Sequence, residues 1–267
     1  NITGDFSSKG PDPFSYDYLA PAITGPGVSV LAGGLGEGMQ ASATSEALLT
    51  DSDFVYKTGT SMSTPHVTGM YALIKAAHPE WSSAVAQSAL MLTADTSVQT
   101  FDKVVDGENT YKQASPHESG AGLAQVHLAI NTGLVMEETI AGYLAADPYG
   151  DDRFVRIDPL DGYYEEVEVG EDKPLPDGWH GKPERLNIAS FSKGQCQQAC
   201  SWKRTLTATK STSWTVSYSY QTPGIELTSD LDDRTISVNE GDQFSINLTA
   251  KLVDGLEEKW AVARVHL

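Results

Sequence analysis

Residues 59–69, Gly-Thr-Ser-Met-Ser-Thr-Pro-His-Val-Thr-Gly, constrain the local fold of this chain more than any other segment. The apolar run at residues 54–56 predicts a short strand, and Gly59 permits a sharp turn after it. Beyond the turn, apolar residues recur at helical spacing, namely Val67, Met70, Tyr71 and Ile74. The sequence therefore predicts a strand, a turn and a helix whose N-terminus lies at or near Ser61.

Ser61 is a candidate nucleophile because of where this pattern puts it. A helix N-terminus gathers unpaired backbone N–H groups and the positive end of the helix dipole. Such a position can stabilise an oxyanion created by attack of a hydroxyl. The plainer alternative is a Ser/Gly-rich turn that only caps a helix. The Gly-x-Ser-x-Gly elbow of α/β-hydrolases does not fit, because its last glycine is replaced by Ser63.

Residues 59–69 closely resemble the nucleophile segment of subtilisin-like serine peptidases, Gly-Thr-Ser-Met-(Ala/Ser)-(Ser/Thr)-Pro-His-Val-x-Gly. Residues 6–11 are similar to the Phe-Ser-Ser-x-Gly-Pro segment of that family. Residues 21–32 are similar to its Pro-Asp-Val-x-Ala-Pro-Gly-Val-x-Ile-Leu-Ala strand, and they depart from it at Ala22 and Gly25.

The resemblance continues downstream of the predicted helix. Residues 78–84 and 88–91 look like the next helix of the family, with Ser82 as its N-cap. Residues 120–135 resemble the closing Gly-x-Gly segment. The pattern best matches the branch with a protease-associated insert and a C-terminal β-domain, which includes cucumisin-like plant enzymes and related secreted bacterial proteases.

The resemblance implies that Ser61 is the catalytic nucleophile and that its backbone N–H is one oxyanion-hole donor. Gly59, Thr60 and Met62 would support the turn that aims it. The family's base and orienting carboxylate lie in His-Gly-(Thr/Ser) and Asp-(Ser/Thr)-Gly motifs before the serine, and neither motif occurs here. Only His180 precedes a glycine, and it follows the serine.

The sequence therefore leads us to expect a C-terminal fragment. The catalytic Asp and His and the oxyanion Asn are expected upstream of residue 1. The segment by itself is predicted to be inactive and to require the upstream half of its own catalytic domain.

Among the other histidines, His66 is interpreted as structural. His66 follows Ser61 by five residues, about 140° around a helix, and so does not face the hydroxyl. His78 precedes Pro79 in a turn between helices and is expected to face solvent, and nothing pairs His117 or His127 with a metal. We expect no cofactor and no metal.

Charge limits the class of partner. The chain carries 36 acidic and 18 basic residues, a net charge of −18, which argues against nucleic-acid binding. No apolar run approaches the length of a membrane span. The expected partners are protein or peptide substrates, and the expected location is extracellular.

The predicted fold class is α/β, with the C-terminal half of a subtilisin-type parallel-sheet domain followed by a partial all-β sandwich. Residues 1–140 form the first part and residues 141–185 an acidic, Pro-rich linker or insertion. Residues 186–267 resemble a fibronectin-type-III-like domain that is truncated. Period-two alternation predicts strands at residues 214–220, 235–238, 244–250 and 260–265. Clustered carboxylates such as Asp147, Asp151 and Asp152 are typical calcium ligands, but their spacing matches no known calcium loop and favours a solvated acidic loop.

The two cysteines, Cys196 and Cys200, are too few for a structural zinc site. In a secreted protein they would close a small loop as a disulfide, as in related bacterial β-domains; two free thiols are the alternative. Asn-x-Thr motifs occur at Asn1 and Asn247, and they matter only if the source glycosylates its secreted proteins.

The predicted function is serine endopeptidase activity through an acyl-enzyme on Ser61. The alternative is an inactive half-domain, or pseudoenzyme, that acts as a protein-binding module.

Overall fold

The computed structural model describes residues 1–12, 15–34, 54–146, 153–157, 164–168, 182–253 and 260–267. The chain divides into two compact units. The first comprises Asn1–Gly10 and Ala20–Thr132, and the second comprises Pro11–Leu19 and Gly133–Leu267. A short segment near the N-terminus therefore packs with the second unit, which the sequence did not indicate.

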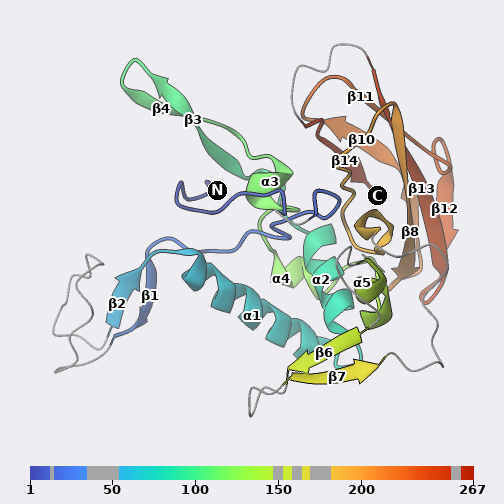
Figure 1. Cartoon of the computed structure of the whole chain (residues 1–267), viewed down its shortest axis with the longest axis horizontal. Coiled ribbons are helices and arrows are strands. Elements are labelled where there is room, and N and C mark those ends of the chain that lie inside the picture. The colour runs from blue at the N-terminus through green and yellow to red at the C-terminus, as the bar shows by residue number, and fades with distance from the viewer. Residues whose placement is uncertain (13–14, 35–53, 147–152, 158–163, 169–181, 254–259) are drawn as a thin grey trace. The chain divides into compact units, whose positions relative to one another are not determined.

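The helices of the first unit are α1 (Thr60–Ala77), α2 (Ser83–Leu92), α3 (Pro116–Ser119) and α4 (Val126–Ala129). The predicted helix after Gly59 is confirmed as α1 (Figure 1). Ser82 caps α2 as expected, because its Oγ accepts a hydrogen bond of 3.2 Å from the backbone N–H of Val85. The core of this unit centres on α2, where the buried apolar residues are Val85, Ala86, Ala89, Leu90 and Met91.

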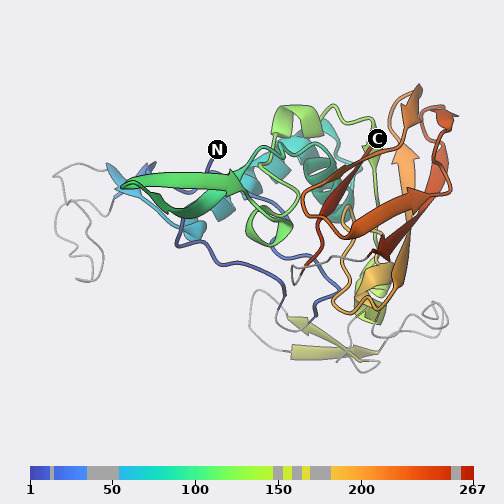
Figure 2. The ribbon, with the colours of Figure 1, turned by 90° about the horizontal axis from the view of Figure 1, so that it is seen from above.

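Two antiparallel pairs make up the strands of the first unit. β1 (Val30–Gly33) pairs with β2 (Phe54–Lys57), and β3 (Gln99–Val105) forms a hairpin with β4 (Glu108–Gln113). Asp106 and Gly107 turn the hairpin with φ values of 52° and 85°, the left-handed conformation that a two-residue turn requires. The hairpin extends away from α2 and α4 (Figures 1 and 2).

The expected parallel sheet is not found among the described residues. All ladders there are antiparallel, and parallel pairing is limited to isolated bridges at Ile2–Gln99 and Thr24–Leu123. A parallel pair needs a crossover connection, usually a helix, whereas β1 and β2 lie side by side in opposite directions and need none.

Helix α1 is mostly exposed in the described part of the chain. Ile74 is the one buried residue of α1, and its neighbour Leu73 is 55% exposed. Only the short α2 and α4 contact α1 to any extent, so most of its surface has no packing partner among the described elements.

The second unit is rich in β-structure. Its largest sheet has the order β11–β13–β8–β5 and is antiparallel throughout. Two further pairs are β10 with β14 and β12 with β9. The bounds are β5 (Leu134–Val135), β8 (Ala199–Ala208), β9 (Thr212–Thr215), β10 (Ser217–Tyr220), β11 (Ile225–Ser229), β12 (Thr235–Val238), β13 (Gln243–Leu252) and β14 (Ala263–His266). Apart from β5, these strands are orange to red in Figure 2.

The predicted strands at residues 235–238 and 244–250 are confirmed. The run 214–220 is divided at Val216, and the last strand begins at Ala263. The apolar core of this unit contains Leu227, Leu248 and Ala250, against which Trp202, Phe191, Tyr218, Ile225, Ala263 and Val265 pack. Side chains of β10 and β14 thus cover one face of the larger sheet; a complete sandwich stays a prediction.

Between β5 and β8 lie α5 (Ile140–Ala146), the strand pair β6 (Arg153–Ile157) and β7 (Tyr164–Glu168), and the 3-10 helix η1 (Pro183–Arg185). The acidic residues Asp147, Asp151 and Asp152 lie outside the described residues. None of the helices in the described part of the chain combines the length and the hydropathy needed to cross a bilayer.

Arg204 organises the chain before β8. It is 1% exposed, and its guanidinium donates hydrogen bonds to the carbonyl oxygens of Glu184, Ile188, Ser190 and Lys203. Burial lowers its pKa to about 10, although nearby carboxylates favour the charged form. Nothing in the sequence pattern around residue 204 indicated that this arginine is buried.

Candidate active site

The turn before α1 is held by backbone hydrogen bonds on both sides. Gly59 is the N-cap; its N–H donates to the carbonyl oxygen of Gly27 over 2.8 Å. Its carbonyl oxygen accepts hydrogen bonds of 3.0 and 3.3 Å from the backbone N–H groups of Met62 and Ser63. The first turn of α1 is therefore tied directly to the segment around Gly27.

Two glycines allow this close approach. A Cβ placed on Gly27 would lie 2.8 Å from the carbonyl oxygen of Gly59. A Cβ placed on Gly25 would lie 2.8 Å from Oγ of Ser63 and 2.9 Å from Cγ2 of Val67. The family pattern has alanine at position 25 and alanine or serine at position 63, so the absence of a Cβ at Gly25 makes room for the Ser63 hydroxyl.

The opposite side of this segment is held by the Gly-x-Gly pair. Thr24 donates its N–H to the carbonyl oxygen of Gly122 over 2.8 Å, and the N–H of Ala121 donates to the carbonyl oxygen of Ala22 over 3.0 Å. A Cβ on Gly120, whose φ is 61°, would lie 2.4 Å from the backbone of Ala22. Residues 22–27 thus lie between the Gly-x-Gly turn and the turn before α1.

Ser61 is the second residue of α1 and is exposed. By helical geometry its N–H has no partner within the helix. Pro65, four residues later, has no N–H and so leaves the carbonyl of Ser61 without its usual helical partner. The Ser61 side chain makes no hydrogen bond to any other described residue. An exposed hydroxyl beside an N–H that has no partner within its own helix can attack a carbonyl and stabilise the resulting oxyanion.

The neighbours of Ser61 shape the same turn. Thr60 begins the helix, and its carbonyl oxygen accepts the Thr64 hydroxyl over 3.0 Å. Met62 is half-buried, and its carbonyl oxygen lies 2.8 Å from Nδ1 of His66. The imidazole of His66 therefore bonds to its own helix rather than to Ser61.

The other described histidines have different partners. Nε2 of His78 lies 2.8 Å from the carbonyl oxygen of Ile130, and the ring stacks on Trp81 with centroids 3.9 Å apart. His117 and His127 lie in α3 and α4. Burial lowers the pKa of His117, while the neighbouring Glu118 opposes this shift.

In the second unit, Nε2 of His266 lies 2.7 Å from Oγ of Ser219. His180 lies outside the described residues. Within the described ranges, then, the structure brings no histidine to Ser61. Those same ranges contain no group of three or more His, Cys, Asp or Glu residues suited to hold a metal ion.

Residues 2–122 match the model of the subtilase family. This match includes the segment 22–27, the Ser61 turn, α1, α2 and the Gly-x-Gly pair.

The chain also has homologues among plant subtilisin-like proteases. It is 35% identical over 156 residues to subtilisin-like protease SBT3.11 of Arabidopsis thaliana, covering 57% of this chain and 19% of that protein. It is 36% identical over 143 residues to SBT1.7 of the same plant, covering 54% and 18%. A tomato (Solanum lycopersicum) protein, subtilisin-like protease SBT3, is 36% identical over 138 residues, covering 52% and 18%. The aligned part is thus about a fifth of the length of these relatives.

Sequence reasoning missed two features of the site. The pairing of Gly25 with Ser63 joins residues far apart in the chain, and only the packing reveals it. The missing helical partner of the Ser61 carbonyl was readable in principle, because a proline four residues after a helical residue always removes that partner.

Proposed function

We propose that this chain is part of a subtilisin-like serine endopeptidase in which Ser61 is the nucleophile. The observation that carries the proposal is the exposed Ser61 hydroxyl at the N-terminus of α1, within a segment that matches the subtilase family. The turn around Gly59 and Gly27 presets the backbone there, so little reorganisation is needed when the oxyanion forms.

The proposed reaction is acyl transfer followed by hydrolysis. Oγ of Ser61 attacks the scissile carbonyl carbon while a histidine that we place upstream of residue 1 takes its proton. The backbone N–H of Ser61 donates to the oxyanion, together with an asparagine that we also place outside this chain. The histidine then protonates the leaving amine, and water releases the acyl group. Gly59, Thr60 and Met62 hold the turn and take no part in proton transfer.

The partner that supplies the histidine and the aspartate is proposed to be the preceding half of the same catalytic domain. Apolar side chains of the β1–β2 pair support this, because Leu31, Phe54 and Tyr56 are 58%, 60% and 72% exposed. Large apolar groups that cluster at a surface normally have a covering partner. The substrates are proposed to be proteins or peptides and the location extracellular. The proposed branch is that with a protease-associated insert, in which residues 186–267 are the fibronectin-type-III-like domain.

The test uses a fluorophosphonate probe, which labels activated serine hydroxyls covalently. We expect labelling of the longer protein that carries the Asp and His motifs together with this chain, and loss of labelling in Ser61→Ala. Ser63→Ala is the matched control, because it changes a serine in the same helical turn and should keep the label. The 267-residue chain alone should not be labelled. Labelling that persists in Ser61→Ala would overturn the assignment.

The alternative is a protein-binding half-domain without activity. It is favoured by one observation, the lack of any histidine at Ser61 within the described residues. It predicts that the longer protein is not labelled under any condition in which a plant subtilisin-like protease is labelled.

A further inference from the structure

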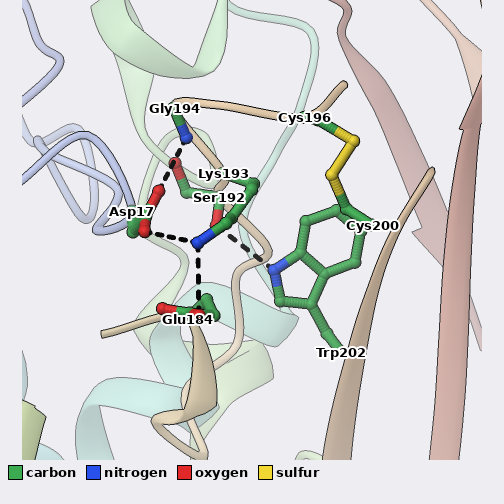
Figure 3. Close-up of a disulfide and its surroundings, with 8 residues drawn as sticks. All are labelled: Asp17, Glu184, Ser192, Lys193, Gly194, Cys196, Cys200 and Trp202. Carbon is green, nitrogen blue, oxygen red and sulfur yellow. Dashed lines mark hydrogen bonds and ion pairs between the residues drawn. A yellow bond between two sulfur atoms is a disulfide. The ribbon is translucent and has the colours of Figure 1, made fainter. Parts of the chain in front are cut away.

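Residues 15–19, here called the strap, are held by the loop that precedes β8. In sequence the strap lies between Gly10 and Ala20 of the first unit, yet it packs with the second. Figure 3 shows its main anchor, the carboxylate of Asp17. Oδ2 of Asp17 accepts a hydrogen bond of 2.7 Å from Nζ of Lys193, and Oδ1 accepts one of 2.7 Å from the backbone N–H of Gly194.

Neighbouring residues extend this anchor. The Ser192 hydroxyl donates to the carbonyl oxygen of Tyr16 over 2.8 Å, and Nζ of Lys193 lies 3.2 Å from a carboxylate oxygen of Glu184. A Cβ on Gly194 would lie 2.4 Å from Cβ of Tyr16, so the strap approaches the loop backbone as closely as glycine permits. Residues 192–194, here called the clasp, thus grip the strap by side chain and backbone.

The ion pair at the centre of the clasp is partly shielded from water. The side chains of Lys193 and Asp17 are 28% and 24% exposed, and that of Glu184 is 19% exposed. Burial by itself would lower the pKa of Lys193, but its hydrogen bonds with Asp17 and Glu184 outweigh burial and raise that pKa. A shielded pair of this kind is screened less by salt than a surface pair.

The Cys196–Cys200 disulfide ties the clasp to the sheet (Figure 3). Cys200 belongs to β8 and is paired with Ala250 of β13, while Cys196 follows Gly194 by two residues. On the sheet side, Nε1 of Trp202 donates to the carbonyl oxygen of Ser192 over 3.2 Å. The disulfide fixes Cys196, two residues after Gly194, to β8, and neither cysteine is fully buried.

We propose that the Cys196–Cys200 disulfide is a redox-sensitive latch that keeps the clasp closed on the strap. A dithiol reductant opens it: one thiolate attacks a cysteine sulfur, the S–S bond breaks and a mixed disulfide forms. The second thiol of the reductant then displaces the protein thiolate, which takes up a proton. The protein gains two thiols and the reductant becomes a disulfide. With the S–S bond broken, Cys196 is no longer fixed to β8, the clasp loses this anchor and the strap is released, whether or not Ser61 is catalytic.

The test is hydrogen exchange by mass spectrometry on the whole chain, with and without dithiothreitol. Reduction should speed exchange of the strap amides by about tenfold or more, while amides of β13 stay unchanged. Cys196→Ser/Cys200→Ser should show the fast strap without reductant and should not respond to it. Asp17→Asn should also free the strap under oxidising conditions, whereas Glu226→Gln, an exposed carboxylate of β11, should not.

Two results would overturn the latch. One is a strap whose exchange stays the same in the reduced chain and in the double serine variant. The other is equal acceleration of the strap and β13, because the disulfide would then stabilise the whole unit rather than the clasp.

Discussion

Replacing Gly120 by alanine tests whether the Gly-x-Gly turn holds the segment that leads to the Ser61 turn. Gly120 ends α3 with a φ of 61° and a ψ of −138°, a conformation that residues with a Cβ rarely adopt. Its new Cβ would lie 2.4 Å from the carbonyl carbon and oxygen of Ala22 and 2.6 Å from the N of Ile23. These are backbone atoms, which cannot move aside as the end of a long side chain can.

The magnitude follows from two separate costs. Backbone strain at such a residue costs about 1–3 kcal/mol, and overpacking against fixed atoms costs about another 1–3 kcal/mol. Because alanine lowers the conformational entropy of the unfolded chain, it offsets about 0.4–1 kcal/mol of this loss in stability. We therefore expect the free energy of unfolding of the first unit to fall by about 2–5 kcal/mol. That is a large share of the roughly 5–15 kcal/mol that stabilises a typical domain.

Hydrogen exchange of the α2 amides is the assay, because α2 carries the core of the first unit. Exchange through global opening should accelerate about 30-fold to about 4,000-fold, at tenfold for each 1.4 kcal/mol. Gly107→Ala is the matched control. The φ of Gly107 is 85°, but its new Cβ would meet open space, so this variant carries the backbone strain without the overpacking. Gly69→Ala, inside α1 with no crowding, should slow exchange of α1 slightly. Unchanged α2 exchange in Gly120→Ala would refute the close approach on which the reasoning rests.

Two further predictions concern the second unit. Arg204→Met keeps much of the side-chain volume but removes the donors to four carbonyl oxygens. We therefore expect the free energy of unfolding of this unit to fall by about 3–5 kcal/mol. Hydrogen exchange of the β8 amides measures this loss. Wild-type exchange in Arg204→Met would show that those carbonyls need no partner. The second prediction is a loss of stability at high pH through Lys193, whose folded-state pKa is raised. Its contribution is complete below its unfolded pKa of about 10.4 and is lost as the pH rises through the higher folded value. The thermal midpoint should therefore fall more between pH 9 and about pH 11.5 in the wild type than in Lys193→Met, and equal falls would contradict this.

Much of the candidate site could be predicted from the sequence because its signals are local. The apolar run at residues 54–56, Gly59 and the helical spacing that follows are near neighbours in the chain, and β2 and α1 formed where they indicated. The Ser82 cap was readable for the same reason, since an N-cap bonds to a backbone N–H only three residues away. The alternation at residues 244–250 likewise predicted β13.

The strand pairing could not be predicted in the same way. The expected parallel sheet rested on resemblance, whereas the described strands pair antiparallel. Which strands become neighbours depends on contacts between distant segments, and no periodicity within a single strand encodes its partner or its direction. The exposure of α1 could not be predicted for the same reason, because it depends on what packs against the helix and not on the helix itself.

The sequence by itself determined the strand–turn–helix around Ser61, its family resemblance and the alternating strands after residue 186, because these depend on residues within a turn or two of one another. Only the tertiary structure decided that residues 11–19 pack with the second unit, that Arg204 is buried and that Gly25 makes room for Ser63. Each of these joins atoms far apart in the chain, where steric fit and desolvation act only once the chain has folded. Local propensity determined where the helices and strands form, and long-range packing determined which distant residues they bring together.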